Sequence, residues 1–140
     1  MIVRSGLIFG TILWVAATAV FVPFGHFVFG PDNRIPAALA AGLIIVATFA
    51  GVYWFALRVL RRSGAAQPDA GALLGVFACL PGLVLDGSLY AFNAGQYPGL
   101  DGSASGTMSA GLLLAYAAAL LAAFAAGRAP RAAAGRQATG

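Results

Sequence analysis

Long apolar stretches alternate with short polar connections along this chain. The apolar stretches cover about residues 6–29, 36–57, 70–92 and 108–127, and none of them contains an arginine. Each is close to the ~20 residues that an α-helix needs to cross ~30 Å of hydrocarbon. The pattern therefore predicts an all-α fold, a bundle of four transmembrane helices within residues 1–128.

Composition agrees with a membrane solvent. Hydrophobic residues make up 61% of the 140 residues and charged residues 9%, whereas a soluble domain carries about 25% charged residues. The net charge of +4 would suggest a nucleic-acid partner in a soluble protein, but here the cations lie at the helix ends. The charge therefore reports membrane topology, and we expect no nucleic acid among the partners.

The distribution of arginines predicts the orientation. If the chain crosses the membrane four times, seven of the eight arginines lie on one side of the membrane. That side holds Arg4, the loop 58–62 and the tail 128–136, and Arg34 lies on the other side. Under the positive-inside rule both termini are cytoplasmic. The end of the chain, 129–140, is small and basic with no apolar face, so the sequence predicts a disordered basic cytoplasmic tail.

Glycines are expected to bring the helices together. In lipid, helices gain little from burying apolar surface, so association depends on close backbone approach at small residues. The first and third stretches each contain a G-x-x-x-G motif, and in the third a stripe of small residues continues toward Asp86. The glycines predicted to pack are Gly6, Gly10, Gly71, Gly75 and Gly82.

Two prolines lie inside predicted spans. Pro23 in the first helix and Pro81 in the third cannot donate a backbone hydrogen bond, and each ring pushes against the carbonyl four residues earlier. The sequence therefore predicts kinks in helices one and three.

Three polar side chains fall in one layer of the membrane. At ~1.5 Å per residue, Asp86 lies roughly 10 Å, His26 roughly 5 Å and Tyr116 roughly 12 Å below the outer boundary. An ionisable residue inside a span usually faces the bundle interior and finds a partner. Two interpretations follow: an outward-facing ligand or proton site on Asp86, His26 and Tyr116, or a hydrogen bond from Tyr116 to Asp86 that only locks the bundle.

Aromatic residues mark the ends of the spans. Amphipathic rings prefer the membrane interface, whereas Trp14 lies too deep to be an interfacial anchor. The aromatic residues that the sequence places in the outer interfacial belt are Phe27, Phe29, Tyr90, Phe92 and Tyr97.

Three segments carry a resemblance over nearly the whole chain up to Gly127. They are F-G-H-F-V-F-G-P at 24–31, L-P-G-L-V-L-D at 80–86, and Y-P-G at 97–99 followed by L-L-L-A-Y at 112–116. In this order and spacing they resemble an uncharacterised family of small bacterial four-span membrane proteins, known only as a domain of unknown function. The resemblance implies the bacterial inner membrane and no known activity.

The residue inventory argues against catalysis. The chain has one histidine, one cysteine and no glutamate, so it lacks the cysteine pairs of thiol oxidases, a second histidine for haem and the common hydrolase motifs. We expect no enzyme, no metal and no cofactor. The favoured function is a non-enzymatic scaffold, partner or lipid-interacting protein, bound by membrane lipids and by a membrane-protein partner or a second copy of the chain. The alternative is a small dimeric proton-linked or substrate transporter that uses Asp86.

The orientation is testable with reporter fusions. A reporter that is active only in the cytoplasm should work when fused after Gly140, and one that is active only outside should work when inserted near Gly102, because seven of the eight arginines flank the inner helix ends. Reporter activity would be measured in whole cells. The opposite result at either position would contradict the four-span topology.

Overall fold

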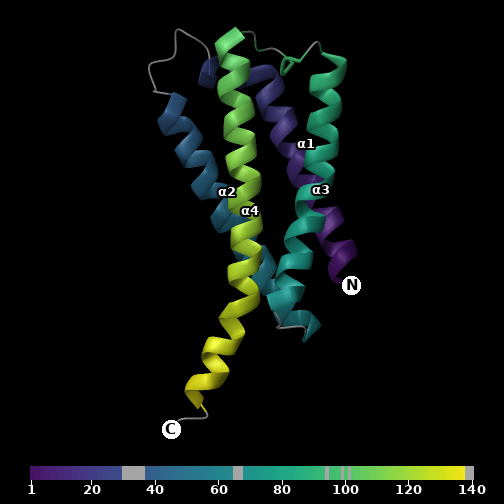
Figure 1. Ribbon diagram of the computed structural model, residues 1–140, viewed down its shortest axis with the longest axis vertical. Coiled ribbons are helices and arrows are strands. Elements are labelled where there is room, and N and C mark those ends of the chain that lie inside the picture. Colours follow the sequence, from purple (N-terminus) through teal and green to yellow (C-terminus); the bar gives the residue numbers. More distant parts are fainter. Residues whose placement is uncertain (30–36, 65–67, 94, 99, 101, 138–140) are drawn as a thin grey trace.

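The computed structural model describes residues 1–29, 37–64, 68–93, 95–98, 100 and 102–137, and among these residues the regular structure is entirely helical. Four helices follow one another up and down, with the start of α1 and the end of α4 at the end of the bundle where α2 ends and α3 begins (Figure 1). They are α1 (Ile2–Phe29), α2 (Ala37–Ser63), α3 (Pro68–Phe92) and α4 (Gly102–Gln137). The predicted all-α four-helix bundle is confirmed.

All four helices are long and apolar enough to cross a membrane, as expected of a small multi-pass membrane protein. Many large apolar side chains are exposed on the outside of the bundle, for example Val46 at 67% and Leu121 at 62%. In water such a surface would cause aggregation, whereas in a membrane it is the lipid-facing surface. Pro23 and Pro81 lie inside α1 and α3, and the kinks expected there stay a prediction.

Two of the three main helix interfaces join helices that are not consecutive in the chain. α1 packs on α3, α3 on α4 and α4 on α2, whereas α1 and α2 make few contacts. The order around the bundle is therefore α1, α3, α4, α2. In this arrangement α1 and α2 pack less closely than the other neighbouring helices.

Glycines allow close backbone approach on two sides of α3. In α1, a Cβ on Gly10 would overlap the carbonyl oxygen of Ala78 in α3, and one on Gly6 would lie 3.0 Å from the carbonyl oxygen of Leu74. The α1 G-x-x-x-G motif thus lies against α3, where only glycine fits at position 10.

The second G-x-x-x-G motif belongs to α3 and lies against α4. A Cβ on Gly71 would come within 2.5 Å of the Ala123 carbonyl oxygen, and one on Gly75 within 3.0 Å of the Ala123 Cβ. α3 therefore presents small residues to α1 and to α4 at once, which places it at the centre of the bundle.

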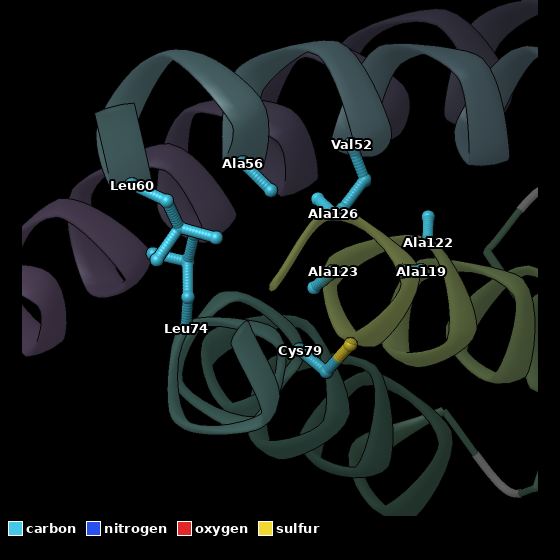
Figure 2. Packing of buried hydrophobic residues seen from close by; sticks show 9 residues of the cluster. All are labelled: Val52, Ala56, Leu60, Leu74, Cys79, Ala119, Ala122, Ala123 and Ala126. Atoms are coloured by element: carbon cyan, nitrogen blue, oxygen red, sulfur yellow. The ribbon is translucent and has the colours of Figure 1, made fainter. Parts of the chain in front are cut away.

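An inner core joins α2, α3 and α4 near the chain termini. Its alanines on α4 are almost completely buried, and Leu60 of α2 and Leu74 of α3 point toward one another across it (Figure 2). Small side chains bring the helices close enough for many atomic contacts. The dispersion attraction of each contact is small, but together the contacts stabilise the packing. The cluster consists of Val52, Ala56, Leu60, Leu74, Cys79, Ala119, Ala122, Ala123 and Ala126.

An outer core closes the opposite end of the bundle. Beyond α3, Gly95 in the left-handed region (φ 78°) donates its N–H to the Tyr90 carbonyl oxygen at 2.8 Å, which turns the chain back over the bundle. Tyr97 and Leu100 then enter the space between the helices and are buried. The cluster consists of Phe29, Tyr97, Leu100, Ala104 and Met108.

Two residues assigned to the outer interfacial belt are instead buried. Tyr97 is 1% exposed and Phe29 is 5% exposed. The backbone N–H of Tyr97 donates to the buried Ser105 Oγ at 2.8 Å, which holds the loop inside the bundle. The expectation that Tyr97 and Phe29 face the membrane interface was therefore wrong. The loop after α3 folds inward and carries the Tyr97 ring to the core, where the end of α1 places Phe29 in the same buried cluster.

The last helix is longer than the apolar pattern indicated. α4 begins at Gly102, six residues before the predicted span, and continues to Gln137, where the sequence suggested a disordered tail from 129. Alanine is the strongest helix former, and the alanines at 129 and 132–134 favour continued helix. From residue 130 on, the side chains lie outside the described part of the structure.

A matched pair of glycine substitutions tests the packing. Gly10→Ala should destabilise the protein by about 1–3 kcal/mol, because α1 must move away from Ala78. Gly51→Ala, in a helix position where a Cβ meets nothing within 4 Å, should leave stability unchanged or raise it by up to about 1 kcal/mol. Thermal unfolding in detergent, followed by size-exclusion chromatography, measures both. Equal midpoints for the two variants would contradict the α1–α3 interface.

Candidate functional site

The buried Asp86 carboxylate connects three helices. It lies on α3 and is 7% exposed. The Trp14 indole of α1 donates its Nε1–H to Oδ1 at 2.8 Å, and the Tyr116 hydroxyl of α4 donates to Oδ2. The structure thus brings Asp86 and Tyr116 together, as the shared layer suggested, and adds a donor from a third helix.

Glycines near Asp86 make these contacts possible. Gly82 lies one turn before Asp86, and a Cβ there would overlap the Tyr116 hydroxyl and ring. Gly10 lies one turn before Trp14 and allows α1, which runs in the same direction as α3 (Figure 1), to approach closely. The long indole can then reach Asp86 across the interface.

Trp14 is the site residue that sequence analysis did not assign. Its depth excluded the interfacial belt, yet the sequence gave no partner for it. A buried indole N–H usually finds an acceptor, and the one carboxylate within the predicted spans was Asp86. That requirement was the signal available in the sequence.

His26 does not belong to the site. Its side chain is exposed, and its ring lies 3.9 Å from the ring of Phe27. The neighbouring Gly25 is buried against Leu100. Since successive helix residues point about 100° apart, His26 turns away from the interior. Sharing a layer with Asp86 and Tyr116 was not enough to place it in the same pocket.

A cavity of about 160 Å³ lies beside Asp86. All four helices and the α3–α4 loop contribute to its wall, which is mainly apolar and aromatic. Its polar side chains are Trp14, Thr18, Thr48, Asp86, Tyr97 and Tyr116.

Aromatic side chains lie at both ends of the cavity. Toward the inner core, the Phe9 ring of α1 stacks on Phe55 of α2 with centroids 3.8 Å apart and planes 9° apart. Toward the outer core, Tyr97 lines the cavity and shares a side-chain hydrogen bond with Thr18. The cavity therefore lies between the two packed cores.

Tyr97 remains a neutral hydroxyl at this outer end. Burial raises the pKa of its phenol above the ordinary value, the hydrogen bond with Thr18 lowers the pKa, and the nearby Asp86 raises it again. A neutral phenol keeps its proton and can serve as a hydrogen-bond donor to a bound molecule.

The wall of the cavity is least closely packed between α1 and α2. These two helices make few contacts with each other, and the lining residue Leu13 on α1 is 40% exposed. Thr18 on α1 and Thr48 on α2 are half-buried lining residues on these two helices. In a membrane, the side of the bundle formed by α1 and α2 would face lipid.

Cys79 also lines the cavity. The thiol is buried and donates to the Tyr116 carbonyl oxygen at 3.7 Å, so it packs as part of the inner core and is the chain's single cysteine. Among the residues with described placement, no group of three or more His, Cys, Asp and Glu side chains could hold a metal ion.

Comparison of the chain with models of protein families, with curated proteins and with solved structures finds no match in any of the three. The resemblance to small four-span bacterial proteins therefore stays a prediction. The function has to be argued from the site itself.

The hydrogen bond from Trp14 is expected to matter for stability. Trp14→Phe leaves the Asp86 Oδ1 atom without its donor and should cost about 1–3 kcal/mol. The control is Trp54→Phe, at a residue that is 57% exposed and stacks only on Arg58 at 4.1 Å, where the loss should be about 0.5–1 kcal/mol. Thermal unfolding midpoints in detergent compare them. A smaller effect at Trp14 than at Trp54 would contradict this assignment.

Proposed function

We propose that this protein is a non-enzymatic protein of the bacterial inner membrane, with both termini in the cytoplasm, that binds a small and mostly apolar molecule from the lipid phase. The molecule enters between α1 and α2 and occupies the cavity beside Asp86. The observation that carries the proposal is this cavity of about 160 Å³. It extends the lipid-interacting function favoured by the sequence.

An empty cavity of this size is costly for a bundle. At about 24 cal/mol per Å³, 160 Å³ corresponds to about 4 kcal/mol. Small residues such as Ala17 and Ala115 line it, and larger apolar side chains there would fill the space. A protein that needed Asp86 only as a structural lock would gain stability from such residues. The presence of small residues in the cavity wall therefore supports a binding role.

The outer surface supports a second role for lipids or partners. Only 6% of the residues in the most apolar window of α1 are buried within the bundle, and large side chains such as Ile12 at 62% and Val20 at 54% are exposed on its outer face. Lipids, a membrane-protein partner or a second copy of the chain can cover it. None of these would require a cavity. The proposed binding function is therefore based on the cavity and not on the outer surface.

Transport is the second candidate, because a buried carboxylate lies in the wall of a membrane cavity. Intramembrane carboxylates often act in proton relays and substrate pathways. Transport would require a second conformation in which the inner or the outer core opens. In the structure both cores are packed, with Leu60 and Tyr97 at 0% and 1% exposure, so binding from the side is favoured.

Two adjacent alanines give a matched test of the cavity. In a Trp54→Phe background, Trp14 is the sole tryptophan, and its emission reports on the cavity that it lines. Titration with benzyl alcohol in lipid nanodiscs should give a saturable change. Ala17→Leu should abolish it by filling the cavity, whereas Ala16→Leu, on the exposed side of the same turn, should not.

A linear response without saturation in the parent would indicate partition into lipid alone and contradict the proposed function. The same would follow if the Ala17 and Ala16 variants bound the probe equally. Circular dichroism of each variant serves as the folding control.

A further inference from the structure

We infer that the molecule bound in this cavity carries one protonated amine, which pairs with Asp86 while its apolar part lies among the aromatic side chains. The inference rests on the proposed function and names the chemical class of its ligand. It follows from the unused acceptor capacity of Asp86, the absence of a cation near it among the residues that the structure describes, the aromatic wall and the volume.

The Asp86 carboxylate has acceptor capacity left over. Its two oxygens offer about four lone-pair sites, and two of these accept from Trp14 and Tyr116. Both donors are neutral groups. They orient the carboxylate but supply no compensating charge, and Asp86 itself lines the cavity.

No cation of the described chain faces Asp86. The arginines with described side chains lie at the inner helix ends, far along α1, α2 and α4 from this layer, and neither they nor the exposed His26 are among the cavity-lining residues of the described ranges. An intramembrane carboxylate usually pairs with an opposite charge. A ligand ammonium entering from the lipid phase would supply that charge.

The wall of the cavity suits a cation with an apolar body. The electron-rich faces of aromatic rings attract ammonium groups, more strongly when water is excluded. Five aromatic side chains from three parts of the chain line this space, and they are Phe9, Trp14, Phe21, Tyr97 and Tyr116. Such a wall disfavours an anion, which Asp86 would also repel.

The volume limits the size of the ligand. The cavity of about 160 Å³ is close to the ~150 Å³ apolar cavity that is known to admit benzene. One aromatic ring or a short alkyl chain, with a single amine, therefore fits. An aryl-methylamine is the simplest probe of this class.

The test compares three probes with the same ring and different head groups: benzylamine, benzyl alcohol and benzoate. The protein is the full chain with Trp54→Phe in nanodiscs, Trp14 emission is the readout, and partition into protein-free nanodiscs is subtracted. Benzylamine should bind at least about tenfold more tightly than benzyl alcohol, and benzoate more weakly than either. In Asp86→Asn the preference for the amine should fall to about onefold, while benzyl alcohol binds as before.

Each other outcome overturns a defined part of the account. Equal affinity for benzylamine and benzyl alcohol in the parent, or a preference that survives Asp86→Asn, would overturn the amine assignment and leave the binding cavity standing. No saturable response to any probe would overturn both. If Asp86→Asn does not fold, the comparison of the three probes in the parent decides alone, because it uses no change at Asp86.

Discussion

A carboxylate inside a membrane-spanning helix constrains everything around it. Asp86 is almost completely buried, and its oxygens need donors at a depth where water is scarce. Trp14 and Tyr116 supply them from two different helices. Because these donors are long side chains directed at one point, the three backbones must approach at fixed positions. The hydrogen bonds therefore set the register of α1 and α4 on α3.

The small residues of the chain serve this arrangement. Gly10 lets α1 come close enough for Trp14 to reach across, and Gly82 makes room for the Tyr116 hydroxyl. The same geometry draws α1 toward α3 and away from α2. Close packing on one side of α1 and a cavity on the other are thus two results of one register. The Trp14 indole, which donates to Asp86, also forms part of the cavity wall, and the cavity therefore lies beside the carboxylate.

Much of the fold could be predicted because length and apolar content alone define a membrane span. The glycine positions were also informative, since in lipid only close backbone approach distinguishes one helix face from another. What the sequence could not provide was the rotation of each helix about its axis. In a helix that is apolar on all sides, no polar stripe marks the face that meets a neighbour. The ligand-site interpretation therefore grouped His26 with Tyr116, although one is exposed and the other lies at Asp86.

The inward fold of the α3–α4 loop had no signal in the sequence either. Tyr97 at a span end is typical of an interfacial anchor, and a linear pattern does not reveal the hydrogen bond from its backbone N–H to Ser105, which holds the loop against α4. Likewise, the order of helices around the bundle, in which α1 and α2 pack only loosely on each other, follows from three-dimensional packing. The candidate site thus combines one residue pair that the sequence suggested with a partner and a cavity that it did not.

The hydrogen bond between Trp14 and Asp86 can be observed directly by NMR of the two indole N–H groups in ¹⁵N-tryptophan-labelled protein, with Trp54→Phe giving the assignment. The structure predicts a Trp14 proton that resonates at lower field and exchanges more slowly with solvent than that of the exposed Trp54, and that moves to higher field in Asp86→Leu. A Trp14 signal that exchanges as fast as Trp54 and does not move in that variant would contradict the account of this site.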